Sequence, residues 1–210
     1  MKKIDKKTFI LTSVITLLPI IIGLLLWDRL PDMIPTHFAM DGTPNGWSSK
    51  PFTVFGLPAL LLFFHLLCLG VTSVDPKYDH MSSKLLGIVV WICPVISLLT
   101  VVSCYSSALG WEFNIARYVM FGSGILFMII GNYLPKCKQN YTMGIKLPWT
   151  LHDEENWNRT HRMAGFLWVA GGVIIAVNAF LEWKWLFLTI VFAMVLVPGI
   201  YSFLYYKKHR

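Results

Sequence analysis

Six apolar stretches, each long enough to cross a lipid bilayer, constrain the fold more than any other feature of this sequence. A membrane-spanning helix needs about 20 predominantly apolar residues. The chain is 56% hydrophobic and only 14% charged, whereas a water-soluble domain would need far more polar surface. We therefore expect an all-α integral membrane protein, a bundle of six transmembrane helices. The expected spans are Thr8–Trp27, Phe52–Val74, Leu85–Leu109, Ile115–Leu134, Met163–Leu181 and Trp185–Tyr206.

Lysine and arginine residues predict the orientation of these spans. When the connections are assigned to alternate sides, fourteen of the 18 Lys and Arg residues fall on one side and four on the other. Because cytoplasmic loops carry the excess of positive charge, both termini are expected in the cytoplasm (N-in/C-in). The net charge of +7 then reflects membrane topology, and not nucleic-acid binding. The first stretch lacks a small-residue cleavage site, so we expect it to remain as an anchor.

The first extracytoplasmic loop, residues 28–51, is rich in residues that form turns. Its four prolines forbid a continuous helix, and Gly42 and Asn45-Gly46 favour tight turns. Its apolar side chains can fold back onto the membrane surface. We therefore expect a compact extracytoplasmic loop, and the alternative is an ordinary interfacial loop with tryptophan anchors. The apolar residues are Ile34, Phe38, Met40 and Trp47.

The longest polar interval is residues 131–162, which the orientation places in the cytoplasm. Proline, asparagine and glycine residues interrupt its first half, so a single long helix is not expected there. Thr150, with Asp153 three positions later, can cap a new helix that runs directly into the fifth span. Arg159 lies four residues after Glu155, which predicts an ion pair on this helix. We expect a cytoplasmic loop followed by a helix.

Acidic and histidine side chains near the start of this helix raise the question of a metal or catalytic centre. Glu154 and His161 are seven positions apart and share a helix face, and His152 could join them from the first turn. The hydrolase motifs HExxH and GxSxG are absent, and acids in a first turn are favoured by the helix dipole alone. A structural or docking surface without a cofactor is therefore preferred to an enzyme. A metal-dependent membrane hydrolase is the alternative.

Polar side chains within the spans are few. His65 lies in the middle of the second span, and Asn178 lies in the fifth. A buried ionisable group in a membrane is costly and marks a functional candidate, but a hydrogen bond to a neighbouring helix accounts for His65 equally well. A small transporter or exporter built around His65 is a further alternative. The spans hold no chain of Asp and Glu residues such as ion-coupled transport usually needs, which disfavours it.

Two ordered sets of residues resemble the motifs of a known family. The first set is Leu30-Pro31, Ile34-Pro35, His37-Phe38, Gly42, Gly46-Trp47 and Ser49-Lys50. The second set is Gly131-Asn132-Tyr133-Leu134-Pro135, Asn140-Tyr141, Gly144-Ile145, Pro148-Trp149-Thr150-Leu151, Trp157 and Thr160-His161-Arg162. The second set is similar to the signature of the SdpI family of bacterial membrane immunity proteins. The first resembles the small membrane domain that is often fused to that family.

This resemblance implies a membrane immunity protein that protects a toxin-producing cell against its own secreted killing peptide by binding. It also implies signalling, in which a cytoplasmic autorepressor is captured at the membrane. We accordingly divide the chain into an N-terminal membrane half, residues 1–110, and an SdpI-like membrane half, residues 111–210. The candidate toxin contacts are His37, Phe38 and Trp47. The candidate contacts of a cytoplasmic partner are Asn132, Tyr133, Asn140, Trp149, Trp157, Arg159 and His161.

Overall fold

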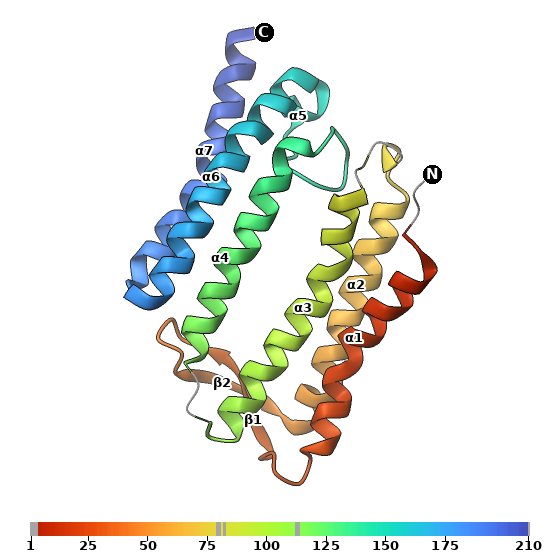
Figure 1. The fold of residues 1–210 in the computed structure, drawn as a ribbon, viewed down its shortest axis with the longest axis vertical. Coiled ribbons are helices and arrows are strands. Elements are labelled where there is room, and N and C mark those ends of the chain that lie inside the picture. The colour runs from red at the N-terminus through yellow and green to blue at the C-terminus, as the bar shows by residue number, and fades with distance from the viewer. Residues whose placement is uncertain (1–3, 79–80, 82, 112–113, 210) are drawn as a thin grey trace. The chain divides into compact units, whose positions relative to one another are not determined.

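The computed structural model describes residues 4–78, 81, 83–111 and 114–209. Six helices in this part of the chain are long and apolar enough to cross a membrane, which confirms the predicted helical membrane fold (Figure 1). A small two-stranded sheet accompanies them. The elements are α1 (Lys6–Leu25), β1 (Met33–Phe38), β2 (Pro44–Ser49), the π-helical turn η1 (Phe52–Gly56), α2 (Leu57–Ser73), α3 (Ser83–Ala108), α4 (Ile115–Tyr133), the 3-10 turn η3 (Leu134–Lys136), α5 (Pro148–His152), α6 (Glu154–Leu181) and α7 (Lys184–His209).

The helix boundaries differ from the predicted spans chiefly at the fifth span. α6 begins at Glu154, well before Met163, because Asp153 caps its N-terminus. The Asp153 carboxylate accepts a hydrogen bond from the Asn156 amide at 3.0 Å. From Glu154 onward, the expected helix and the fifth span form one continuous helix, as the sequence predicts, whereas the residues before Asp153 form the separate short helix α5.

The chain forms two compact units. The first consists of Met1–Val71 and Leu86–Ala116, and it holds α1, both strands and nearly all of α2 and α3. The second consists of Thr72–Leu85 and Arg117–Arg210, and it holds nearly all of α4 together with α5, α6 and α7. The connection between α2 and α3 thus belongs to the second unit, although both helices belong mainly to the first.

A β-hairpin forms after α1, where the sequence predicts only a compact loop. β1 and β2 pair in antiparallel orientation. Their turn closes through a hydrogen bond from the Ala39 amide to the Thr43 carbonyl at 2.8 Å. Gly42 adopts a φ of 83° in this turn, a conformation that favours glycine, so the turn predicted there is confirmed. Asn45-Gly46 lies inside β2 instead, where the strand register is irregular, so the second predicted turn is wrong.

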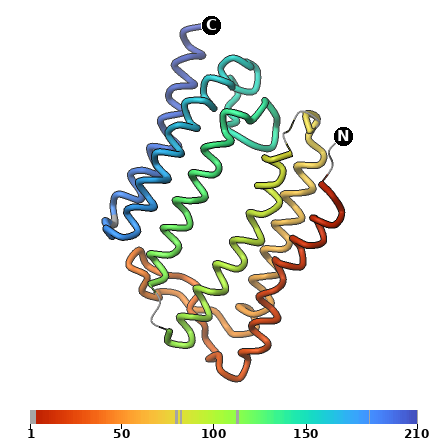
Figure 2. Tube along the Cα trace, viewed as in Figure 1, coloured from red at the N-terminus to blue at the C-terminus, as the bar shows by residue number. Residues whose placement is uncertain are grey.

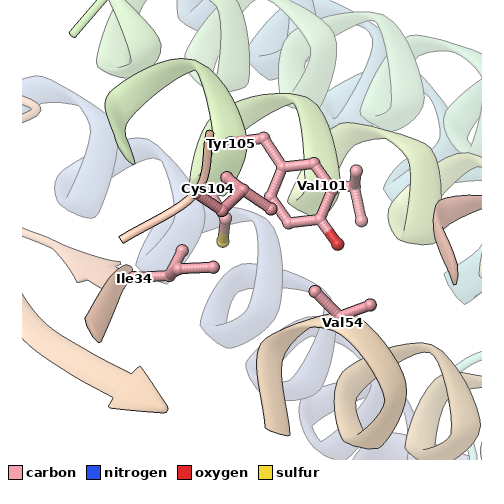
Figure 3. Packing of buried hydrophobic residues seen from close by; sticks show 6 residues of the cluster. Ile34, Val54, Val101, Cys104 and Tyr105 are labelled. Carbon is pink, nitrogen blue, oxygen red and sulfur yellow. The ribbon is translucent and has the colours of Figure 1, made fainter. Parts of the chain in front are cut away.

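Ile34 anchors the hairpin in the core of the first unit (Figure 3). Its side chain is fully buried in a cluster with Val54 of η1 and Tyr105 of α3, and not on the membrane surface as expected. Lys50 holds the end of the hairpin, because its Nζ donates to the Trp27 carbonyl at 3.2 Å and lies over the Trp27 ring. The buried cluster also contains Leu30, Val101 and Cys104.

Polar side chains inside the first unit join its helices to one another. His65 Nε2 and the Thr12 hydroxyl are 3.1 Å apart, which links α2 to α1. The Ser97 hydroxyl donates to the Thr16 carbonyl at 2.8 Å, which links α3 to α1. All four residues are fully buried. His65 therefore has a packing role between helices, while its Nδ1 has no hydrogen-bond partner among the described residues.

Glycine residues let α4 and α6 approach closely in the second unit. A Cβ added at Gly124 would lie 2.6 Å from the Gly172 carbonyl oxygen, and one added at Gly165 would lie 2.8 Å from the Gly131 carbonyl oxygen. The two glycines of each helix are seven positions apart, so both contacts fall on one helix face. Small residues allow the backbones of membrane helices to meet in this way.

α6 and α7 lie side by side in antiparallel orientation, as Figures 1 and 2 show. Their connection is short, and Asn178 clamps it. The Asn178 side chain donates to the Trp183 carbonyl and accepts from the Trp183 amide, both at 3.1 Å. Glu182 ends α6 with a φ of 57° and pairs with Arg117 at 2.8 Å. These contacts favour a structural role for Asn178 over a functional one.

Candidate functional site

The polar interval folds as a loop of residues 137–147 between η3 and α5, followed by the start of α6. Asn140 sets the shape of this 137–147 loop from its interior, because its side chain is almost fully buried. Its Oδ1 accepts hydrogen bonds from the amides of Thr142 and Met143 at 2.9 and 2.6 Å. Its Nδ2 donates to the Lys138 carbonyl at 2.9 Å. Asparagine side chains commonly hold turns by such bonds to their own backbone.

Trp157 and His161 of α6 form the buried centre under the 137–147 loop. Trp157 is fully buried, and its Nε1 donates to the Cys137 carbonyl at 2.7 Å. The two rings stack with centroids 4.0 Å apart. The Ile145 amide donates to His161 Nε2 at 2.9 Å, and His161 Nδ1 lies 2.8 Å from the Trp157 carbonyl. Since Nε2 accepts and Nδ1 must donate, this geometry requires a neutral imidazole with its proton on Nδ1.

Gly144 lets the loop backbone reach the stacked rings. It adopts a φ of 104°, which side chains rarely tolerate. A Cβ at this position would also press against His161 Nε2 and lie 3.1 Å from the Trp157 ring. Two independent constraints therefore require glycine here.

Replacement of Gly144 by alanine is expected to lower the free energy of unfolding by roughly 1–3 kcal/mol, because the new methyl group combines backbone strain with a clash. The measurement is thermal unfolding of the purified protein in detergent. Gly122→Ala on α4 is the control, because among the described residues no atom beyond its own helix turn lies within 4 Å of an added Cβ there. Equal stability of the two variants would contradict the assigned role of Gly144.

Thr150 closes the 137–147 loop at its other end. Its hydroxyl accepts from the Leu147 amide and lies 2.9 Å from the Ile145 carbonyl. Gln139 donates to the carbonyls of Thr150 and Leu151 at 2.9 and 3.0 Å. The prediction that Thr150 caps the long helix is wrong, because Thr150 lies within α5 and Asp153 caps α6.

α7 supports α5 and α6 through a second polar cluster. Trp149 Nε1 donates to the Ser202 hydroxyl at 2.5 Å, and its ring stacks on Tyr206 with centroids 5.8 Å apart. Asn156, fully buried, donates to the Ser202 carbonyl at 3.1 Å. The Thr160 hydroxyl donates to the Asn156 side chain at 3.0 Å. The loop and its three supporting helices are thus joined by specific hydrogen bonds.

Cys137 belongs to this scaffold and not to a reactive centre. Burial raises the pKa of its thiol to about 11, and the hydrogen bond from the Asn140 side chain offsets only part of that rise. The thiol is therefore protonated at neutral pH, whereas nucleophiles and metal ligands are thiolates.

The segment between α2 and α3 also binds the 137–147 loop. Asp75 is largely buried, and one of its carboxylate oxygens accepts from the Tyr141 amide at 2.9 Å and from the Thr142 hydroxyl. Lys77 donates to the Gln139 side chain and lies over the Tyr141 ring, 5.5 Å from its centroid. Sequence reasoning missed Asp75. The position before Pro76, at the end of an apolar run, indicates a turn, but no local pattern indicates so distant a partner.

The structure does not bring the metal candidates His152, Glu154 and His161 together as a site. Asp153 interrupts the expected helix, so His152 ends α5 while the other two lie on α6. His152 Nδ1 is 2.6 Å from the Pro148 carbonyl, and both ring nitrogens of His161 bond to the backbone. Across the described residues, no group of three or more His, Cys, Asp or Glu side chains is placed to hold a metal ion.

The candidate contacts of a cytoplasmic partner divide into exposed and buried residues. Asn132 and Arg159 are exposed, and Arg159 forms the predicted ion pair with Glu155 at 2.8 Å. Tyr133 is half-buried beneath the Lys136 ammonium, which lies 5.0 Å from its ring centroid. Trp149 is also half-buried, and the buried members are Asn140, Trp157 and His161.

The candidate toxin contacts lie on the hairpin. His37 is exposed, and its Nδ1 lies 2.5 Å from the Asn45 side-chain oxygen on the other strand. Trp47 is 53% exposed, and Phe38 is half-buried. Met33 and Met40 add further exposed apolar surface. The hairpin thus combines a buried anchor with an apolar outer surface.

Contacts within each unit agree with the predicted alternation of loops across the membrane. In the second unit, Asp75 bonds to Tyr141, so the connection after α2 and the 137–147 loop share one side. In the first unit, Gly42 of the hairpin turn lies beside Ala116 at the start of α4. The hairpin therefore shares a side with the first residues of α4.

Comparisons with known proteins cover nearly the whole chain. The SdpI/YfhL protein family matches residues 136–202, and a domain of unknown function (DUF1648) matches residues 14–62. The chain is 30% identical over 209 residues to a Bacillus subtilis (strain 168) protein named Immunity protein SdpI. The alignment covers 96% of this chain and 97% of that protein. No solved structure matches the chain.

Proposed function

The chain belongs to the SdpI/YfhL protein family, and on this basis we propose that it is an immunity protein of the plasma membrane that protects the cell from a secreted killing peptide. The observation that carries this proposal is the end-to-end similarity to Immunity protein SdpI. Six helices capable of spanning a membrane support the multi-pass location. Membership in a family that contains an immunity protein also supports the prediction that the chain is not an enzyme.

The outer surface of the hairpin is proposed to meet the killing peptide. Trp47 and His37 are exposed there, and Phe38 is partly accessible. Tryptophan residues often dominate binding energy at protein interfaces because one side chain offers a large rigid apolar surface. The buried anchor Ile34 and the clamp at Lys50 hold this surface in a fixed shape, which lowers the entropic cost of binding.

The face around the 137–147 loop is proposed to meet a cytoplasmic protein, such as a transcriptional repressor. The exposed candidates Asn132 and Arg159 can contact it directly. Asn140, Trp157 and His161 are buried, and so their proposed role is to hold the loop in shape. The exposed aromatic and cationic side chains of this face suit the membrane–water interface as well as a protein partner.

Survival under peptide challenge tests the proposed immunity. The chain is expressed in bacteria that are sensitive to a candidate killing peptide, and an empty vector serves as the control. We expect more survivors among cells that carry the chain. If the protein accumulates in the membrane and cells remain as sensitive as the control to every candidate peptide, the proposed function is contradicted for those peptides.

A further inference from the structure

Asp75 lies outside both matched regions, residues 14–62 and 136–202. It is nevertheless largely buried against the 137–147 loop. A buried carboxylate requires several hydrogen-bond donors, because it has given up its hydration. Asp75 obtains them from two segments of the chain. Its Oδ1 accepts from the Lys77 amide at 2.8 Å, and its Oδ2 accepts from the Tyr141 amide at 2.9 Å and from the Thr142 hydroxyl.

We infer that Asp75 is a positioning residue for the 137–147 loop and sets the shape in which this loop meets its partner. The inference rests on the proposed function of the loop as a partner-binding surface. Tyr141 and Thr142 occupy the middle of the loop, next to the turn that Asn140 forms. Hydrogen bonds that a carboxylate accepts are about twice as strong as those between neutral groups. The loop is therefore fixed from outside as well as from within.

The position of Asp75 ties the loop to the end of α2. α2 ends at Ser73, and Asp75 follows two residues later. Lys77 reinforces the contact between this segment and the 137–147 loop, because it bonds to Gln139 and lies over the Tyr141 ring. The shape of the proposed partner-binding surface thus depends on Asp75, a residue of the connection between α2 and α3.

Amide hydrogen exchange of the full-length protein in detergent tests the contact directly. Asp75→Ala removes both acceptor oxygens of the side chain. Exchange at the Tyr141 amide is expected to rise by roughly tenfold to a hundredfold because its hydrogen bond to Asp75 is lost. Asp28→Ala, at an exposed carboxylate, is the control and should exchange as the wild type does. Wild-type exchange in Asp75→Ala would overturn the inference.

A conservative pair of variants at Thr142 separates positioning from general stability. Thr142→Val removes the hydroxyl that bonds to Asp75, whereas Thr142→Ser keeps it. We expect Thr142→Val and Asp75→Ala to capture less of a candidate cytoplasmic repressor in membranes that hold normal amounts of the protein, and Thr142→Ser to capture as much as the wild type. Wild-type capture by Asp75→Ala despite faster exchange would show that the contact is purely structural and overturn the inference. If even the wild type captures no repressor, the proposed function of the loop fails, while the exchange measurement still decides whether Asp75 holds the loop.

Discussion

Replacement of Trp157 by alanine is expected to lower the free energy of unfolding by about 3–5 kcal/mol, because truncation of a fully buried aromatic residue leaves a cavity. Trp157 is fully buried, donates to the Cys137 carbonyl and stacks on His161. The substitution removes the buried ring, its hydrogen bond and its stacking contact at once. The measurement is thermal unfolding in detergent, together with the amount of protein in the membrane.

The matched control for this variant is Trp185→Ala, because the Trp185 side chain is 77% exposed. It removes the same ring without opening a cavity inside the protein. We expect near wild-type stability for Trp185→Ala and a much lower unfolding temperature for Trp157→Ala. Similar stability of the two variants would show that Trp157 is not the centre of the loop scaffold.

Replacement of Gly172 by leucine is expected to destabilise the second unit by about 2–3 kcal/mol, because overpacking a close backbone contact forces the helices apart. A Cβ at Gly172 would lie 2.6 Å from the Gly124 carbonyl oxygen and 2.8 Å from the Met128 amide nitrogen. Both neighbours are backbone atoms, which cannot rotate away as a side chain can. The expected result is a lower unfolding temperature and less protein in the membrane.

Gly199→Leu on α7 is the control for that variant. Beyond its own helix turn, no described atom lies within 4 Å of an added Cβ at Gly199, so the same substitution adds apolar surface without a clash. Equal behaviour of Gly172→Leu and Gly199→Leu would contradict the close packing of α4 against α6.

The spans and several local contacts could be predicted from the sequence because each depends on neighbouring residues. Apolar runs of sufficient length identify the helices. The Glu155–Arg159 ion pair follows from a spacing of four residues on a helix. The turn at Gly42 follows from the freedom of glycine to adopt a positive φ. In each case the relevant physics acts within a few positions along the chain.

The hairpin could not be predicted in the same way. β2 is the segment PNGWSS, whose proline, asparagine and glycine are unfavourable in strands. It forms a strand because β1 pairs with it and because Ile34 is buried against η1 and α3. Tertiary packing therefore overrides local propensity at this point.

The contacts inside the candidate site also could not be predicted from local sequence patterns. Asn140 and His161 lie in a polar interval, where side chains are usually solvated, yet both are almost fully buried. Asp75 bonds to the Tyr141 amide across 66 positions of the chain. Such contacts depend on how helices bring distant loops together, and no local periodicity encodes them.

The most direct test of the proposed function compares the killing-peptide concentration that inhibits cells carrying the wild type, cells carrying Trp47→Ala and cells carrying an empty vector. Trp47 is 53% exposed on the hairpin, so its truncation should leave the fold intact. Loss of an aromatic anchor at an interface typically costs about 2 kcal/mol or more in binding. We predict that the wild type raises the inhibitory concentration and that Trp47→Ala, at the same membrane level, protects much less. No protection by the wild type would contradict the immunity function, and full protection by Trp47→Ala would contradict the hairpin as the site of contact.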